Sequence, residues 1–246
     1  FQKALSPGDI KPLTLEGHKY LNKIADFKKP VVAAIHGNCL GAGLEIAMAC
    51  HVRIAANDKK TKLALPEVKL GLLPGGGGTQ RLPRLVGIQK ALDMMLTGKN
   101  VYANKAFRMG LVDRLSNPDV LHKAAKDFAL ELTKKKFTRK DKRKLFEKLL
   151  EGNPITRGII FKKARQMVVG MTKGNYPAPL RILDCVEAGY KGGPKAGYAT
   201  EIEHFENLVL SNESRQLINI FFAMTDKKKN PYSGQEKQII EYFKKN

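Results

Sequence analysis

The apolar positions at the start of the chain recur with a helical period, and further along they form short consecutive runs. Leu13, Gly17, Leu21 and Ile24 recur at helical spacing, and Pro30 ends that pattern. The runs that follow are short and rich in β-branched residues, which is typical of buried strands. The pattern predicts strands at 31–35, 52–55, 62–65 and 111–115, and helices at 42–48, 79–97 and 103–109.

The order of these elements predicts the fold class. Strands that alternate with helices indicate parallel βαβ units, and Gly98 is placed to end the helix that begins at Thr79. Beyond Asn117 the strand signals vanish, and helical segments are separated by Gly, Pro and Asn. We expect an α/β core followed by an all-helical C-terminal segment, with helices at 121–133, 141–150, 155–169, 179–189 and 199–209.

The net positive charge favours anionic binding partners but does not indicate the fold. The 246 residues include 44 Lys and Arg against 23 Asp and Glu, a formal net charge of +21. Nucleic acid, an anionic membrane and a polyphosphate ligand such as coenzyme A all suit this charge, as does a plain lysine-rich surface. Residues 134–148 hold nine of the cations beside an apolar stripe. Such a basic amphipathic helix can lie on an anionic membrane, but it is more often a surface helix packed on its own core.

The cysteines and histidines predict neither a disulfide nor a metal site. Cys39, Cys50 and Cys185 lack C-x-x-C spacing, and the five histidines lack metal-ligand spacing. His36 is expected to order a loop. No apolar run is long enough to cross a bilayer, and the start of the chain lacks signal-peptide architecture. We expect a reducing compartment, the bacterial cytoplasm first and the mitochondrial matrix second.

Two glutamates stand in apolar surroundings next to glycine-rich bends. Glu45 follows a Gly-Ala-Gly bend that opens an apolar helix, and Glu67 precedes a turn of four glycines at 75–78. Two carboxylates in opposite protonation states can move protons at a reacting carbon, and backbone N–H groups can stabilise an oxyanion. Plain alternatives are a buried ion-pair partner, a helix start at Pro66, and a flexible turn or phosphate cradle. The joint order and spacing of these features favour catalysis.

These two segments resemble the crotonase (enoyl-CoA hydratase/isomerase) superfamily over residues 14–115. Within it, the chain is similar to the hydratase part of the multifunctional α subunits of fatty-acid oxidation complexes. That finer resemblance is carried by NYPAPLRILDCVEAGYKGGPKAGYATEIEHFENLVLS at 175–211 and FFAMTDKKKNP at 221–231, because simple hydratases generally lack both. The resemblance implies a crotonase-like ββα spiral core, of which this chain lacks the N-terminal part and a second oxyanion donor.

The resemblance also implies a reaction and its residues. The reaction is hydration of trans-2-enoyl-CoA, with Δ3-to-Δ2 isomerisation as a further activity. Glu45 and Glu67 are the catalytic pair: both hold the water, Glu67 donates the proton to Cα, and Glu45 helps to orient and activate the water. The N–H of Ala42 would stabilise the thioester oxygen, which requires a negative φ at this residue, and the N–H of Gly75 would contact the water. The residues expected to line the acyl-thioester pocket are Leu40, Gly41, Pro66 and Gly71.

The same resemblance suggests domains and partners. It implies a partial hydratase core at 1–117, the helical part of that domain at 118–174, and a helical linker at 175–246 towards a 3-hydroxyacyl-CoA dehydrogenase domain that the chain lacks. The hydratase step needs no cofactor, since coenzyme A belongs to the substrate, and NAD would serve only the dehydrogenase. The implied partners are an acyl-CoA thioester and a thiolase β subunit, while specific nucleic-acid binding is not expected. The alternative is a non-catalytic basic module that binds anionic membrane or nucleic acid.

Overall fold

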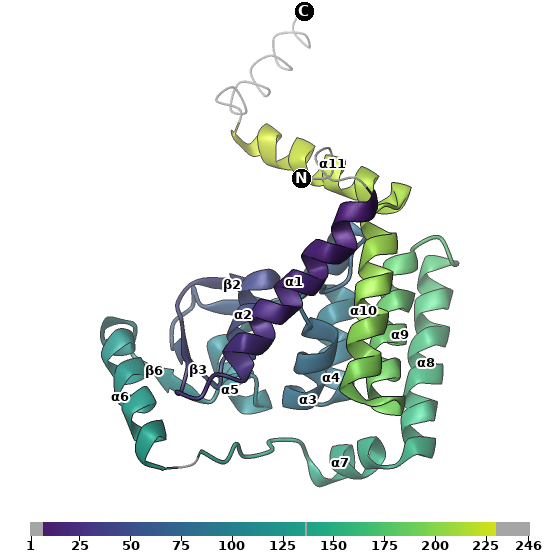
Figure 1. Cartoon of the computed structure of the whole chain (residues 1–246). Helices are drawn as coiled ribbons and strands as arrows, with labels where there is room; N and C mark the ends of the chain where they lie inside the picture. The colour runs from purple at the N-terminus through teal and green to yellow at the C-terminus, as the bar shows by residue number, and fades with distance from the viewer. Residues whose placement is uncertain (1–6, 136, 230–246) are drawn as a thin grey trace, which may run out of the picture.

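The computed structural model describes residues 7–135 and 137–229, which form two small sheets surrounded by helices (Figure 1). The strands are β1 Val32–Ile35, β2 Asn38–Leu40, β3 Val52–Ala56, β4 Lys62–Ala64, β5 Val101–Tyr102 and β6 Arg114–Ser116. The α-helices are α1 Pro7–Ala25, α2 Ala42–Ala49, α3 Gly78–Val86, α4 Ile88–Thr97, α5 Ala103–Met109, α6 Leu121–Lys134, α7 Leu145–Gly152, α8 Pro154–Thr172, α9 Pro177–Lys191, α10 Gly193–Val209 and α11 Asn212–Lys229. Two 3₁₀ turns complete the order, η1 Glu67–Leu70 and η2 Pro118–Val120.

The two sheets have three strands each. The first has the order β1-β3-β6 and is parallel, with Val32 opposite Val52 and Ile54 opposite Arg114. In the second, β2 runs parallel to β4, and β5 runs antiparallel to β4. The helix α2 lies in the connection between the parallel neighbours β1 and β3, so the predicted βαβ unit is confirmed.

The predicted helix at 79–97 is wrong as a single element. It breaks at Gly87, whose φ of 90° and ψ of 161° lie outside the helical region, and α4 starts at the next residue. The last strand begins at Arg114 rather than at 111, because the N–H groups of Leu111 and Val112 both donate to Ala106 O and close α5. A further difference is β2, Asn38–Leu40, where no strand was predicted.

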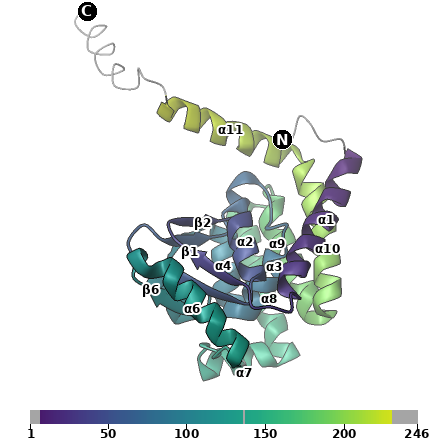
Figure 2. The same cartoon turned by 60° about the vertical axis from the view of Figure 1, so that its left-hand side comes forward.

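The predicted C-terminal helices occur, with three differences. The helix predicted at 199–209 begins at Gly193. The helix predicted at 141–150 begins at Leu145, since the Asp141 carboxylate accepts a hydrogen bond from the backbone N–H of Arg143 and forms a turn there. The last helix, α11, was not predicted. Figure 2 shows α11 extending away from the layered part of the molecule, and residues 230–246 of the predicted linker lie outside the described residues.

One hydrophobic core joins the sheets to the C-terminal helices. Leu82 and Met95 of α3 and α4 belong to the same buried cluster as Ile182 and Val186 of α9. Figure 1 shows α8, α9 and α10 side by side, and α9 packs against α3 and α4. On the other side, α6 covers β1 and β3. The helices α9 and α10 therefore share the core of the βαβ part.

The basic segment before α7 is tied to the chain by several of its own cations. Arg53, fully buried in β3, forms an ion pair with Asp113 at 3.2 Å, and Arg139 Nε contacts the other oxygen of Asp113 at 2.7 Å. Lys142 Nζ donates to a main-chain carbonyl oxygen at 2.6 Å. These contacts leave fewer free charges in the run for an external anion.

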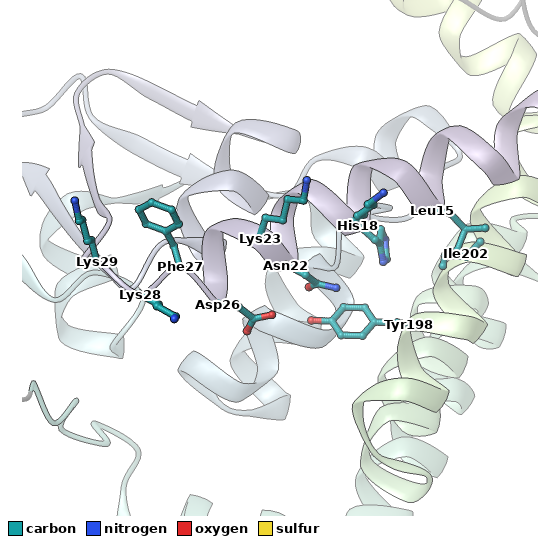
Figure 3. A pocket seen from close by; sticks show the side chains of 11 residues that line it. Leu15, His18, Asn22, Lys23, Asp26, Phe27, Lys28, Lys29, Tyr198 and Ile202 are labelled. Atoms are coloured by element: carbon teal, nitrogen blue, oxygen red, sulfur yellow. The ribbon is translucent and has the colours of Figure 1, made fainter.

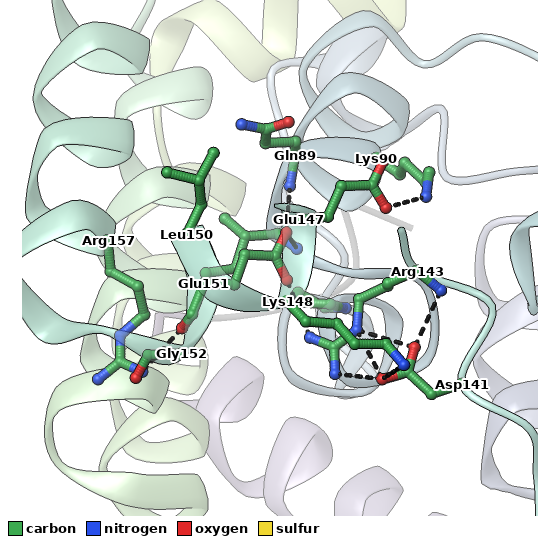
Figure 4. A network of polar contacts seen from close by, with 12 residues as sticks. Gln89, Lys90, Asp141, Arg143, Glu147, Lys148, Leu150, Glu151, Gly152 and Arg157 are labelled. Carbon is green, nitrogen blue, oxygen red and sulfur yellow. Dashed lines mark hydrogen bonds and ion pairs between the residues drawn. The ribbon is translucent and has the colours of Figure 1, made fainter. Parts of the chain in front are cut away.

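A second polar network attaches α7 to the start of α4 (Figure 4). Glu151 Oε1 accepts a hydrogen bond from the N–H of Ile88 at 2.8 Å, and Arg143 Nη1 lies 3.0 Å from Glu151 Oε2. Lys90 Nζ contacts Glu147 Oε2 at 2.7 Å. Glu151 thus caps a helix that begins directly after the Gly87 break and that has no capping side chain of its own.

The described residues contain neither a membrane-spanning helix nor a cluster of metal ligands. None of the helices in residues 7–135 and 137–229 is long and apolar enough to span a bilayer. The same residues contain no group of three or more His, Cys, Asp or Glu side chains placed to hold a metal ion.

Candidate active site

Glu45 and Glu67 meet at the N-terminal end of α2. Gly41, with φ 56°, turns the chain from β2 into α2, and Glu45 follows in the first turn, 4% exposed. Glu67 is the first residue of η1, three positions after the end of the strand β4 that pairs with β2. A Cβ atom on Gly41 would lie 3.0 Å from Glu67 Oε1, so the glycine gives this carboxylate its place. The pairing of the two short strands thus brings together two glutamates that are 22 positions apart.

The glycine turn at 75–78 holds Glu45 in place. The N–H groups of Gly76 and Gly78 donate to Glu45 Oε1 at 2.8 and 2.7 Å. A Cβ atom on either glycine would lie 2.7 Å from a carboxylate oxygen of Glu45, so only glycine permits this approach. These N–H groups are engaged by a side chain of the protein. The N–H groups of Gly76 and Gly78 are therefore not available to a substrate oxygen.

A third carboxylate, Glu201 of α10, also binds this turn. It is fully buried and accepts the N–H of Gly77 at 2.6 Å. Its Oε1 also lies 3.1 Å from His18 Nε2 on α1. Glu201 was not predicted to belong to the site, because an acidic residue in a helix that carries other charged residues gives no signal of burial. His18, expected to be a surface or packing residue, is buried beside it.

Burial raises the pKa of both predicted catalytic carboxyl groups. The pKa of Glu45 rises to about 8, mainly through burial and then through the charges of Glu201 and Glu67, against which the two glycine N–H groups act. Burial raises the pKa of Glu67 to about 7, with a further contribution from Glu201. Glu67 Oε2 is buried without a hydrogen-bond partner. Because their charges interact, the two groups titrate as a pair in the neutral range.

The higher pKa of Glu45 and its hydrogen bonds point in opposite directions. The value alone would leave the proton on Glu45, whereas two N–H donors on one oxygen favour the anion there. The hydrogen bonds distinguish the two groups, because two N–H donors stabilise an anion on Glu45 whereas Glu67 Oε2 has no donor to stabilise a negative charge.

The other predicted residues fall into two groups. Ala42 opens α2, so its N–H has no acceptor within the helix. Its φ is negative as required, since Lys173 is the only non-glycine residue with positive φ among those described. Ala42 and Gly75 line the same cavity as the two glutamates. The lining of that cavity does not include four residues predicted for the pocket: Leu40, Gly41, Pro66 and Gly71.

Gly71 packs elsewhere than predicted. It has φ 71°, and a Cβ atom there would lie 2.8 Å from the backbone of Ser214 at the start of α11. Leu40 pairs with Ala64 in the second sheet, and Pro66 precedes η1. These residues shape the strands and turns around the two glutamates, while the wall of the cavity comes from other elements.

The cavity wall is mostly apolar, and its polar side chains are Glu45, Glu67, Thr14, His18 and Tyr20. The volume of the cavity is about 630 Å³, within the range usual for small-molecule sites. Most of its wall consists of side chains from α1, together with Leu72, Leu73 and Phe205. An apolar chain could therefore lie next to two carboxyl groups and the first turn of α2. The apolar residues that α1 contributes are Ile10, Leu13, Leu21 and Ile24.

A basic groove adjoins this cavity. It lies between α1 and α10, has a volume of about 1040 Å³, and shares His18 with the cavity as a common lining residue. Figure 3 shows Lys23, Lys28 and Lys29 along α1 and the segment that follows it, with Tyr198 on the opposite side. The apolar cavity and a cationic groove thus stand side by side.

Comparison with known proteins shows the family to which the sequence is similar. The family described as enoyl-CoA hydratase/isomerase matches residues 7–165. The chain is 51% identical over 226 residues to the fatty acid oxidation complex subunit alpha of Shewanella loihica, which covers 92% of the chain and 32% of the relative. The corresponding subunit of Shewanella sp. strain ANA-3 is 51% identical over 222 residues, or 90% and 31%. The chain spans about a third of the length of these relatives.

Solved structures of enoyl-CoA hydratases have a fold similar to that of this chain. The enoyl-CoA hydratase of Geobacillus kaustophilus superposes with a TM-score of 0.52 at 26% identity, covering 91% of the chain and 70% of that structure. The predicted crotonase-like fold with a helical C-terminal part and the predicted similarity to oxidation-complex α subunits are confirmed. The chain therefore belongs to the enoyl-CoA hydratase/isomerase family.

Proposed function

We propose that this chain carries an enoyl-CoA hydratase activity of fatty-acid β-oxidation, adding water to trans-2-enoyl-CoA. The observation that carries the proposal is the pair Glu45 and Glu67, two buried carboxyl groups with raised pKa at one apolar cavity. Neutral-range pKa values suit groups that both accept and donate protons near pH 7. Hydration needs both transfers, at Cβ and at Cα.

The hydrogen bonds suggest which carboxylate does what. Glu45 Oε1 accepts two N–H groups, so this carboxylate is held in one orientation from which it can position and activate a water molecule. Glu67 Oε2 has no partner and is buried, as suits a carboxyl group that presents its proton to Cα. The N–H of Ala42, at the positive end of the α2 dipole, would stabilise the thioester oxygen. Gly75 lines the cavity beside the proposed water.

The basic groove fits the other part of an acyl-CoA substrate. Coenzyme A carries phosphate groups, which lysines of the groove such as Lys23 and Lys28 can attract. The acyl chain would then pass His18, which lines both spaces, and enter the apolar cavity. This arrangement needs no cofactor for the hydration step. Isomerisation of a Δ3 double bond needs a proton moved between carbons by one carboxylate, and Glu67 is the proposed group.

The partners are inferred from the relatives. Since these are named as subunits of a fatty acid oxidation complex, we propose that the chain works in a multienzyme complex, with a thiolase β subunit and with an NAD-dependent dehydrogenase elsewhere in the protein. A cytoplasmic location is proposed on the same ground. Contact of α7 with an anionic membrane stays a proposal, supported by the exposed side chains of Leu145, Phe146 and Leu149 beside Lys148.

The test is an absorbance assay of crotonyl-CoA with the full-length protein that contains this chain. Loss of the conjugated enoyl thioester, with formation of 3-hydroxybutyryl-CoA, is the expected result. A Δ3-enoyl-CoA substrate assayed in parallel measures isomerisation. The proposal is wrong if a folded protein turns over neither substrate, and binding of DNA or anionic vesicles by that inactive protein would favour the basic-module alternative.

A further inference from the structure

Glu201 binds the same turn as Glu45, from a helix far along the chain. Its Oε1 accepts the N–H of Gly77 at 2.6 Å, and its Oε2 accepts the N–H of Thr79 at 3.1 Å and the Thr79 hydroxyl. The N–H groups on either side of Gly77 donate to Glu45 instead. Successive N–H groups of the turn thus alternate between two buried carboxylates.

His18 contacts both the glycine turn and Glu201. Its Nε2 lies 2.7 Å from Gly75 O, at the start of the turn, and 3.1 Å from Glu201 Oε1. A main-chain carbonyl oxygen can only accept, so Nε2 carries the hydrogen and donates. The ring of Tyr198 packs edge-on against the imidazole at 5.4 Å between centroids and fixes its plane. The helices α1 and α10 are therefore joined through the glycine turn.

Gln80 links the turn to α9 as well. Its Nε2 donates to Thr79 Oγ1 at 2.9 Å and to Cys185 O at 2.8 Å. A Cβ atom on Gly189 or Gly197 would overlap the Gln80 side chain, so both helices leave room for it. The start of α3 is thus bound to α9 and α10 by a continuous set of buried hydrogen bonds.

We propose that Glu201, oriented by His18, is a positioning residue of the hydration reaction: it fixes the glycine turn that orients Glu45 and places a negative charge beside the catalytic pair. This inference rests on the proposed hydratase function. Glu201 is not part of the cavity lining, so it acts through Glu45 and Glu67 and not on the substrate. The helices α9 and α10 then support the active site through the glycine turn.

The charged surroundings of Glu201 support the second role. Next to burial, the Glu201 charge raises the pKa of Glu45, and it also contributes to the raised pKa of Glu67. Burial raises the pKa of the Cys185 thiol and the Tyr198 hydroxyl, which therefore stay neutral near pH 7. The titratable and charged groups that face Glu201 are His18 of α1, Glu45 of α2, Glu67 of η1, Cys185 of α9, Tyr198 of α10 and, over the Tyr198 ring at 5.5 Å, Arg81 of α3.

The experiment compares Glu201→Gln, Glu201→Asp and the exposed neighbour Glu203→Gln in the full-length protein. Crotonyl-CoA hydration is measured from pH 5 to 9 for kcat and KM. For Glu201→Gln we expect kcat to fall about tenfold at an unchanged KM. We also expect both limbs of the pH profile to move about one pH unit lower, because the variant lacks the negative charge that raises the pKa of Glu45 and Glu67. Glu201→Asp retains the negative charge, so the limbs of its pH profile should stay at the wild-type pH values even if its kcat is lower. Glu203→Gln should match the wild type in rate and profile.

The outcomes separate the two proposals. A wild-type protein without hydratase turnover contradicts the proposed function itself. With an active wild type, a Glu201→Gln profile that superposes on the wild-type limbs, or that differs only in KM, overturns the positioning role. If Glu201→Gln shows no cooperative melting, Thr79→Val replaces it: this change removes one donor to Glu201 and keeps the charge. We then expect a several-fold lower kcat without a shift of the limbs, and an unchanged kcat overturns the inference.

Discussion

Gly41 leaves the space that the Glu67 carboxylate occupies, since a Cβ atom on Gly41 would lie 3.0 Å from Glu67 Oε1. Gly41 also has φ 56° and ψ −130°, a conformation that L side chains rarely adopt. We predict that Gly41→Ala lowers the free energy of unfolding by about 1–3 kcal/mol and reduces kcat by displacing Glu67. Denaturant unfolding and crotonyl-CoA turnover measure the two effects.

Gly43 provides a matched control two residues later. It lies inside α2, and a Cβ atom there would meet nothing within 4 Å. Because alanine stabilises a helix interior relative to glycine by about 0.5–1 kcal/mol, Gly43→Ala should leave stability equal or slightly higher and retain activity. Equal behaviour of the two variants would show that Gly41 has no special role.

The catalytic pair is tested by amide substitutions that keep size. Glu45→Gln and Glu67→Gln should each lower hydratase kcat by at least about a hundredfold, the scale of lost general acid–base catalysis. Isomerisation should suffer more from the change at Glu67. Steady-state kinetics on crotonyl-CoA and a Δ3-enoyl-CoA give both numbers, and near wild-type hydration by either variant would remove that residue from the mechanism.

The raised pKa of Glu67, about 7, predicts how stability depends on pH. The folded state holds this proton up to a higher pH than the unfolded chain, so the contribution of Glu67 to stability falls as pH rises from about 4.5 to 7. Glu67→Gln removes this loss. Relative to wild type, the variant should therefore gain stability between pH 5 and pH 8, by on the order of 1–3 kcal/mol. Thermal melts at the two pH values check it, and a constant difference between the proteins contradicts it.

Glu151 should matter for stability without affecting catalysis. It is 4% exposed, caps α4 through Ile88 N–H and pairs with Arg143. Glu151→Ala removes the cap of α4 and leaves Arg143 paired with Asp141 alone, so we expect a loss of about 1–3 kcal/mol. Glu151→Gln keeps one acceptor oxygen and should lose less. Unfolding curves for both variants, with kcat as the control, test this order.

The basic groove should recognise the nucleotide part of the substrate. Lys23→Glu and Lys28→Glu should raise KM for crotonyl-CoA about five- to tenfold, and the effect should shrink at high salt because the attraction is electrostatic. The same variants should handle crotonyl-N-acetylcysteamine, which lacks the phosphates, as the wild type does. Lys105→Ala, an exposed lysine of α5, is the control. An equal loss with both thioesters would indicate a distorted cavity and no phosphate contact.

The sequence by itself determined the elements with strong local signals. The run at 31–35 became β1, and the segment 103–109 became α5 with the predicted bounds, because apolar period and glycine stops act over a few residues. The motifs around Glu45 and Glu67 likewise indicated the correct family, since their order and spacing are written in the chain. Where that local signal is weak, as at Gly87 in an otherwise helical pattern, the prediction failed.

Only the tertiary structure decided the contacts between segments that are distant in the sequence. The helix breaks at Gly87, and Glu151, 64 positions later, caps the helix that follows. The glycine turn became a clamp for carboxylates because α10 brings Glu201 to it from 124 positions beyond Gly77. Burial is a property of packing between distant segments, and it is burial that raises the pKa of Glu45. No local pattern records which helix covers a turn, so this part of the site became visible only in the fold.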